Sequence, residues 1–266
     1  MRKVKWMLAV LFVIALPQTK PAAGATEHGR ANPLIDKDAM AILMKMADFL
    51  SQTKNFSVTI ETGYDVVQET GQKIEFGAVR NVIIQRPDRI RVDIRQRDGT
   101  RAEFIFDGKQ IYFFNEGAQV YGMVERAGTI DEAMRYFTED LQMRLPLSEL
   151  FSTDIPRLFK DRVRDLAYID TAAIDGGSCD HLAARTDTVD FQVWIEQGEM
   201  PLPKRTIIAY NDAAGEPHFW AQFKEWDLAP EISEAVFTIK PPKGAEQIPF
   251  VSLMQFEANA GEKQGD

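Results

Sequence analysis

The sequence contains one cysteine, three histidines and no long hydrophobic run beyond its N-terminal segment. A single cysteine, Cys179, cannot form an internal disulfide, so stability has to come from packing. Positive charge is also scarce, because 31 lysines and arginines face 40 acids and give a net charge of −9. An acidic chain repels phosphate backbones, and we therefore expect no nucleic-acid binding.

The first 25 residues have the features of a cleavable secretory signal peptide. A basic start at residues 1–5 precedes an apolar run at 6–16 that is too short for a stable membrane anchor. The small residues Ala23 and Ala25 fit a signal peptidase, and we place cleavage after Ala25. An uncleaved anchor is the alternative. Because the apolar run is not followed closely by a cysteine, the lipid attachment of bacterial lipoproteins is excluded.

Removal of this leader takes away four basic residues and no acid, so the net charge changes from −9 to −13. The mature chain is then expected to be soluble in the periplasm of a Gram-negative-type cell. We expect one domain over residues 26–256 and a disordered polar tail over 257–266.

Between residues 57 and 125 the hydrophobic pattern has the period of two that is typical of β-strands. Turn signals such as Asp98-Gly99 and Asp107-Gly108 separate the runs and predict an antiparallel meander. The strands are expected at 57–67, 73–85, 89–97, 101–106, 110–115 and 120–125. We assign the hydrophobic side chains to one face, and to the opposite, wet face the charged residues Arg80, Arg91, Asp93, Arg95 and Glu103.

Helices are predicted in two places. Asn32 and Pro33 begin an amphipathic helix that extends to about Lys54. A capping box at Thr129 and Glu132 begins a second helix that ends near Pro146, and short helical turns follow at 147–151 and 155–159. This insertion is either a plug that fills the core or a lid. Strands resume at 164–172, 179–186, 189–196, 204–211, 218–226 and 236–239.

These elements predict a mainly β fold. About a dozen antiparallel strands with few helices favour an incomplete, half-open β-barrel capped by amphipathic helices. Such a sheet has a hydrophobic concave face that must be covered.

The sequence offers little catalytic chemistry. His28, His181 and His218 are far apart, and no known catalytic or phosphate-binding motif is present. Cys179 and His181 lie two residues apart in a predicted strand, which leaves three interpretations: half of a zinc site, an activated thiolate, or a buried thiol beside a hydrogen-bonded histidine. We predict no catalytic residue, no metal and no cofactor.

Two segments resemble the periplasmic lipoprotein carriers of the Lol pathway, the LolA/LolB-like proteins. They are the turn Arg86-Pro87-Asp88 with Arg89-Ile90, and the run 106–115, Phe-Asp-Gly-Lys-Gln-Ile-Tyr-Phe-Phe-Asn. The segment 237–244, Phe-Thr-Ile-Lys-Pro-Pro-Lys-Gly, is similar to the closing motif of the carriers. The closer resemblance is to an uncharacterised family of predicted periplasmic proteins grouped with them, and residues 176–182, 189–196 and 201–204 carry it.

The resemblance implies an incomplete β-barrel whose helices cap a hydrophobic cavity. In the carriers the arginine of the Arg-Pro turn bonds to the capping helices and holds the lid, and the matching residue here is Arg86.

We therefore expect a non-enzymatic periplasmic protein that binds an acyl chain, a lipid or the lipid anchor of a lipoprotein. Its partners would be a lipid or lipidated protein, and a membrane-associated protein is a further candidate. The candidate cavity residues are Val82, Ile84, Ile90, Val92, Phe104, Phe106, Met134, Phe137 and Leu141. Two alternatives are a sensory or scaffold module that binds a protein, and an enzyme that uses Cys179 and His181.

Overall fold

The computed structural model describes residues 35–255, so the predicted signal peptide and the C-terminal tail lie outside the described part of the chain. The first block of strands follows the predicted meander closely. It consists of β1 (Asn55–Val67), β2 (Lys73–Gln85), β3 (Arg89–Gln96), β4 (Arg101–Phe106), β5 (Gln110–Asn115) and β6 (Val120–Glu125).

The second block also lies within two residues of the predicted bounds, apart from its last strand. It consists of β7 (Asp165–Ile174), β8 (Gly177–Arg185), β9 (Val189–Glu196), β10 (Pro203–Tyr210) and β11 (His218–Asp227), and a short β12 (Glu246–Gln247) follows.

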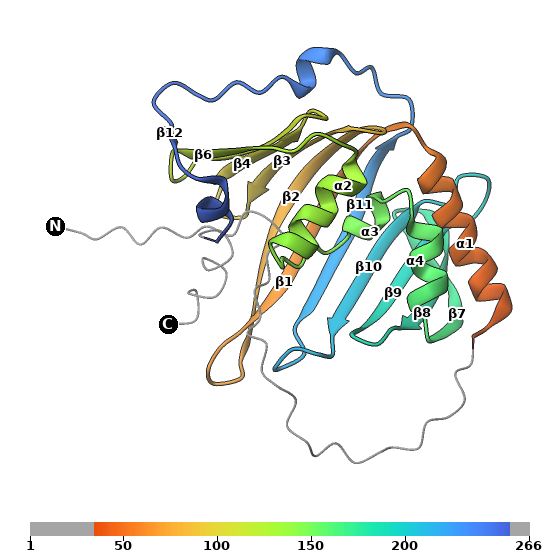
Figure 1. Ribbon diagram of the computed structural model, residues 1–266. Coiled ribbons are helices and arrows are strands. Elements are labelled where there is room, and N and C mark those ends of the chain that lie inside the picture. Colours follow the sequence, from red (N-terminus) through yellow and green to blue (C-terminus); the bar gives the residue numbers. More distant parts are fainter. Residues whose placement is uncertain (1–34, 256–266) are drawn as a thin grey trace.

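These twelve strands belong to one sheet, in the order β12-β6-β5-β4-β3-β2-β1-β11-β10-β9-β8-β7. Neighbouring strands are antiparallel, except that β12 pairs in parallel with β6. The edge strands β12 and β7 do not pair with each other, so the curved sheet stays open (Figure 1). The predicted mainly β, half-open barrel is thus confirmed.

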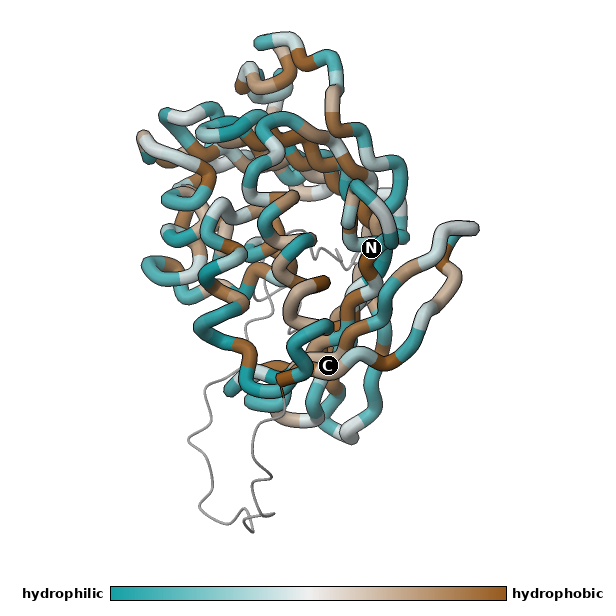
Figure 2. Tube along the Cα trace, turned by 90° about the vertical axis from the view of Figure 1, so that its right-hand side faces the viewer, coloured by the Kyte–Doolittle hydropathy of each residue, from teal (hydrophilic) through white to brown (hydrophobic). Residues whose placement is uncertain are grey.

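The α-helices of the described residues lie on the concave side of this sheet (Figure 1). They are α1 (Lys37–Gln52), α2 (Ile130–Arg135), α3 (Ser148–Phe151) and α4 (Ile155–Arg162). Hydrophilic and hydrophobic residues alternate along the helices in Figure 2, as expected for helices with one buried face.

The first helix begins later than predicted. Its N-cap is Asp36, whose carboxylate accepts hydrogen bonds from the backbone N–H groups of Asp38 (2.8 Å) and Ala39 (3.2 Å). The predicted cap at Asn32 lies outside the described residues, and Asp36, closer to the apolar stripe, satisfies the free N–H groups of this helix.

The second predicted helix is interrupted. α2 ends at Arg135 and continues as a π-helical turn, η1 (Tyr136–Asp140), which closes with a hydrogen bond from Leu141 N to Tyr136 O (3.0 Å). The wider turn buries the adjacent side chains of Tyr136 and Phe137 together, and Gln142 then adopts a left-handed backbone conformation that ends the helix.

The predicted strand 236–239 is wrong. Residues Glu234–Phe237 form a 3-10 turn, η2, on the outer face of the sheet, where Phe237 packs with Ile105, Tyr112 and Phe114. Two prolines follow at 241 and 242 and cannot donate to a strand ladder. The connection from β11 to β12 therefore crosses the outer face (Figure 1).

Arg80 lies on the face opposite to the one predicted. The pairing of β1 with β2 is continuous, so residue 80 shares the concave face with Val82 and Ile84. The side chain is 3% exposed and donates to the Thr62 hydroxyl, and burial lowers the pKa of its guanidinium to about 10. The charge of Arg80 is typical of an exposed face, whereas its position in the strand places it on the concave face.

Two hydrophobic clusters fill the concave side. The larger one joins the first strand block and β11 to α2 and η1. The smaller one joins α1 and α4 to β7, β8 and β9. Leu150, Trp226 and Leu228 pack against both clusters and mark the seam between them. Within residues 35–255, no helix combines the length and the hydropathy that crossing a membrane would require.

Candidate functional site

A cleft of about 390 Å³ opens on the concave face at this seam. Its floor is formed by β9 and β10, and its walls by α4 and by residues 129–151, which we call the lid segment. The strands supply the floor because alternate residues point the same way: Val189, Phe191 and Val193 from β9, and Thr206 and Ile208 from β10.

The deep part of the cleft is apolar. Phe159 of α4 stacks on Phe191 of β9, with ring centroids 5.9 Å apart and planes 18° apart. Met46 of α1 and Leu147 and Leu150 of the lid segment complete this wall. The volume lies in the range of small-molecule sites, about 300–1,000 Å³. Such a pocket suits a flexible hydrocarbon better than a polar ligand.

The lining also includes two arginine–carboxylate pairs. Arg144 of the lid segment donates from Nη1 and Nη2 to the two carboxylate oxygens of Asp212, at 3.0 and 2.7 Å. Its guanidinium lies 5.3 Å from the ring centroid of Tyr210, and burial raises the pKa of that tyrosine. Arg162 of α4 is paired with Glu149 of the lid segment. These charged groups are partly exposed, in contrast to the apolar floor.

The predicted cavity residues lie elsewhere. All nine belong to the larger hydrophobic cluster, as buried members or packed against it, and none of them lines the cleft. Phe137 of the lid segment packs on Phe104 of β4 with ring centroids 5.8 Å apart. In this structure the lid side chains fill the space over β2, β3 and β4, and the role of these nine residues in binding stays a prediction.

Arg86 contacts the capping segment as the resemblance implied. Its Nη1 donates to the backbone oxygen of Phe151 at the end of α3 (2.7 Å), and its Nε donates to Thr53 O just after α1 (3.1 Å). The guanidinium lies 5.9 Å from the ring centroid of Phe56, and burial lowers its pKa. One side chain thus joins the lid segment and α1 to the end of β2.

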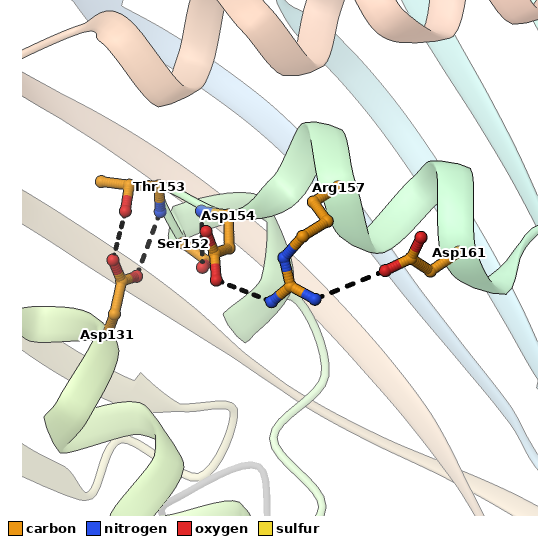
Figure 3. A network of polar contacts seen from close by, with 6 residues as sticks. All are labelled: Asp131, Ser152, Thr153, Asp154, Arg157 and Asp161. Carbon is orange, nitrogen blue, oxygen red and sulfur yellow. Dashed lines mark hydrogen bonds and ion pairs between the residues drawn. The ribbon is translucent and has the colours of Figure 1, made fainter.

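The start of the lid segment is held by further polar contacts. Ile130 N donates to Pro87 O (2.8 Å), beside Arg86. The Asp131 carboxylate accepts from the N–H (3.0 Å) and the hydroxyl of Thr153, which precedes α4 (Figure 3). Arg157 on the exposed side of α4 pairs with Asp154 and Asp161 (Figure 3). The lid segment is therefore tied at both ends, and its middle is held by side-chain packing and by the Arg144–Asp212 pair.

Cys179 and His181 have different surroundings in the structure. Cys179 is completely buried, and burial is the main cause that raises the pKa of its thiol. His181 stacks on Trp194 at 4.1 Å, and its ring nitrogens lie 3.3 Å from an Asp170 oxygen and 3.0 Å from an oxygen of Gln192. In the part of the chain that the structure describes, no group of three metal-ligating side chains is found. The geometry matches the interpretation of a buried thiol near a hydrogen-bonded histidine.

Sequence reasoning missed the cleft residues of the second strand block. The signal that could have found them is the alternation of hydrophobic residues in 189–196 and 204–211, to which Phe191 and Ile208 belong. That pattern shows which face is covered, but it does not show where the covering helices leave a space.

Comparisons with known proteins complete this description. The model of a family described as "Predicted periplasmic protein (DUF2092)" matches residues 39–251. The search of curated proteins finds no match.

Several solved structures have a similar fold. An uncharacterized conserved protein from Thermus thermophilus is 12% identical, with a TM-score of 0.47, over 80% of this chain and 99% of that one. The lipoprotein LppX from Mycobacterium tuberculosis is 14% identical, with a TM-score of 0.47, over 74% of this chain and 100% of that one. A LolA superfamily protein from Nitrosomonas europaea is 12% identical, with a TM-score of 0.39, over 76% and 97%.

At these identities the similarity to solved structures concerns the fold alone. The family match covers most of the chain and confirms the sequence resemblance to an uncharacterised family of periplasmic proteins. The chain belongs to the DUF2092 family of predicted periplasmic proteins.

Proposed function

We propose that this protein binds an acyl chain of a lipid, or of a lipidated protein, in the cleft over β9 and β10. The observation that carries the proposal is an apolar cleft of about 390 Å³ at the seam between two hydrophobic clusters. Each methylene that moves from water into such a site contributes about 0.8 kcal/mol. An acyl chain consists mainly of methylene groups, so its binding free energy benefits most from an apolar lining.

The mechanism that we propose is displacement of the lid segment. A chain longer than the cleft extends along the concave face and replaces the contacts that Met134, Phe137 and Leu141 make with the sheet. The lid contacts and the ligand contacts exclude each other. The net free energy of binding is therefore smaller than the free energy that burial of the acyl chain alone would contribute. Ligand exchange therefore stays reversible.

We also propose a cellular setting for this non-enzymatic role. The family description and the N-terminal sequence support a periplasmic protein that is released by cleavage after Ala25. N-terminal sequencing of the exported protein tests this step, and a mature chain that starts at Thr26 is the expected result. A chain that retains residues 1–25 would contradict it.

The binding proposal is tested by filling the cleft. Ile208 lines it from β10, whereas Ile207 is the next residue on the same strand and is not among the lining residues. Equilibrium dialysis with radiolabelled oleyl alcohol, a neutral acyl probe, would compare Ile208→Trp with the matched control Ile207→Trp. We expect the cleft-filling variant to bind at least about tenfold more weakly, and the control to bind like the unchanged protein.

Thermal unfolding of both variants shows whether they are folded. A smaller second variant, Val193→Phe, narrows the same floor if the tryptophan at 208 disturbs folding. Equal binding by the cleft-filling variants and the control would mean that the ligand binds elsewhere on the protein. Absence of binding of both oleyl alcohol and oleate to the unchanged protein would overturn the function itself.

A further inference from the structure

Charged side chains line the cleft together with its apolar interior. Arg144 and Arg162 are both among the lining residues, Arg144 from the lid segment and Arg162 from α4. The side chains of Arg144 and Arg162 are 32% and 56% exposed, and a long arginine side chain can cover apolar surface with its methylene stem while its charged end stays in water. Ser148 and Thr188 add hydroxyl groups to the same lining.

Both arginines already hold a carboxylate. The Asp212 carboxylate meets Arg144 through two parallel hydrogen bonds, which is the geometry that a free carboxylate or a phosphate adopts on a guanidinium. Arg162 holds Glu149 in the same region. The two acids therefore occupy the positions that an anionic ligand group would take.

Replacing these acids costs little. Both pairs are partly exposed, and breaking such an ion pair changes an equilibrium by about fivefold at most, because water solvates the separated charges nearly as well. Asp212 lies in an exposed turn after β10, so its carboxylate can be solvated when it leaves Arg144. A cationic ligand group would have to take the acid away from its arginine and would then lie beside that arginine, whose positive charge repels it.

We propose that the acyl ligand carries an anionic end group, a carboxylate or a phosphate, which Arg144 and Arg162 bind in exchange for Asp212 and Glu149. This inference rests on the proposed acyl-binding function and names its class of ligand. Arg144 and Glu149 belong to the lid segment, so the exchange also breaks two of its ties, to Asp212 and to Arg162. Binding of the end group and opening of the lid are thereby coupled.

Three probes with the same hydrocarbon chain test the proposal: oleate, 1-oleoyl lysophosphatidic acid and oleyl alcohol, each below its micellar concentration. Equilibrium dialysis with the unchanged protein should give severalfold tighter binding of at least one anionic probe than of the alcohol. The preference between oleate and the lysophosphatidate tells a carboxylate from a phosphate source. Added salt should weaken the binding of the anionic probe and leave the binding of the alcohol unchanged.

Charge variants assign the effect to these residues. Arg144→Gln with Arg162→Gln should abolish the preference for the anion while the alcohol still binds, and Asp212→Asn should strengthen anion binding severalfold. Arg157→Gln is the matched control, because Arg157 lies on the same helix as Arg162 in exposed ion pairs and does not line the cleft.

The outcomes separate the two proposals. Equal affinity for all three probes, or a preference for the alcohol, overturns the anionic end group and leaves acyl binding intact. Loss of the preference in Arg157→Gln as well would assign it to overall charge and would also overturn the site. No binding of any probe contradicts the acyl-binding function instead.

Discussion

Arg86 has a role both in the fold and in the proposed mechanism. A single side chain satisfies the backbone oxygens of Phe151 and Thr53, which belong to different segments of the helical cover. The fork of a guanidinium can bond in two directions at once, whereas a lysine ammonium is one point charge on a flexible stem. The resemblance to lipoprotein carriers predicted this contact, and no periodicity or spacing in the sequence would have done so.

Replacement of Arg86 should change ligand exchange. Arg86→Leu leaves two partly buried carbonyl groups without their donor and should lower the free energy of unfolding by about 1–3 kcal/mol, measured by urea denaturation. A loosened lid competes less well with the ligand, so we expect a lower off-rate of a bound acyl probe in competition kinetics. Arg86→Lys should act in the same direction and preserves the charge.

Arg101→Leu is the control for Arg86, because it removes an exposed arginine at the start of β4. An off-rate in Arg86→Leu that equals that of the control would contradict the role of Arg86 in holding the lid segment.

Cys179 should be inert in the folded protein. The thiol is buried, and burial raises its pKa, so the reactive thiolate is scarce at neutral pH. We expect no modification by a thiol reagent under native conditions and full modification in denaturant. Rapid reaction of the folded protein would revive the hypothesis of an enzyme that uses Cys179 and His181.

At the scale of elements, the lid segment is the part whose role needs a test. Phe137 is 1% exposed and packs on Phe104 and Phe250. Phe137→Ala should destabilise the ligand-free protein by about 3–5 kcal/mol in urea denaturation, since it leaves a cavity in the larger cluster. The exposed Glu139→Ala in the same turn is the control.

A lid and a plug differ in what the Phe137 variant does to binding. If the lid competes with the ligand, Phe137→Ala should bind oleyl alcohol more tightly than Glu139→Ala does. Lower stability with unchanged affinity would mean that the segment is part of the permanent core.

Asp131 connects two of these elements. Its carboxylate holds the N–H and hydroxyl of Thr153 and so ties α2 to the beginning of α4 (Figure 3). Asp131→Ala should cost about 1–2 kcal/mol of unfolding free energy, and Asp161→Ala, which removes an exposed ion pair at 3.4 Å, should cost less than about 0.5 kcal/mol. Equal effects in urea denaturation would argue against this tie.

The strands were largely predictable from the sequence, and the reason is local. β2, β4, β5, β6 and β9 begin and end at the predicted residues, because alternation and turn residues act over a few positions. The helical cover was less predictable. The π-turn at Tyr136 and the 3-10 turn at Phe237 depend on the contacts that these aromatic rings make with parts of the sheet that are distant in sequence.

The candidate site was predictable only in kind. A hydrophobic concave face under helices was expected, and the structure confirms its architecture. The nine predicted residues nevertheless lie where the lid fills the space, and the cleft lies over Phe191 and Ile208. The position of the cleft on the sheet depends on how well the helical cover fits the concave face, and this fit is a property of packing in three dimensions.

At the scale of the whole molecule, the open sheet explains why a cleft exists at all. A closed barrel of this length would fill its interior from all sides, whereas this sheet relies on two separate helical groups that cover its two halves. The seam between them is the place where the cleft opens. We expect ligands to bind where the two groups meet.

The most direct test of this account is native mass spectrometry of the mature protein, purified from periplasm without detergent and followed by lipid extraction. The account predicts an acyl-bearing species bound at nearly one per chain, or a mass shift when phospholipid or lipopeptide is added. An unshifted ligand-free mass in every case would contradict it, and a stable protein partner recovered with that chain would favour the scaffold role instead.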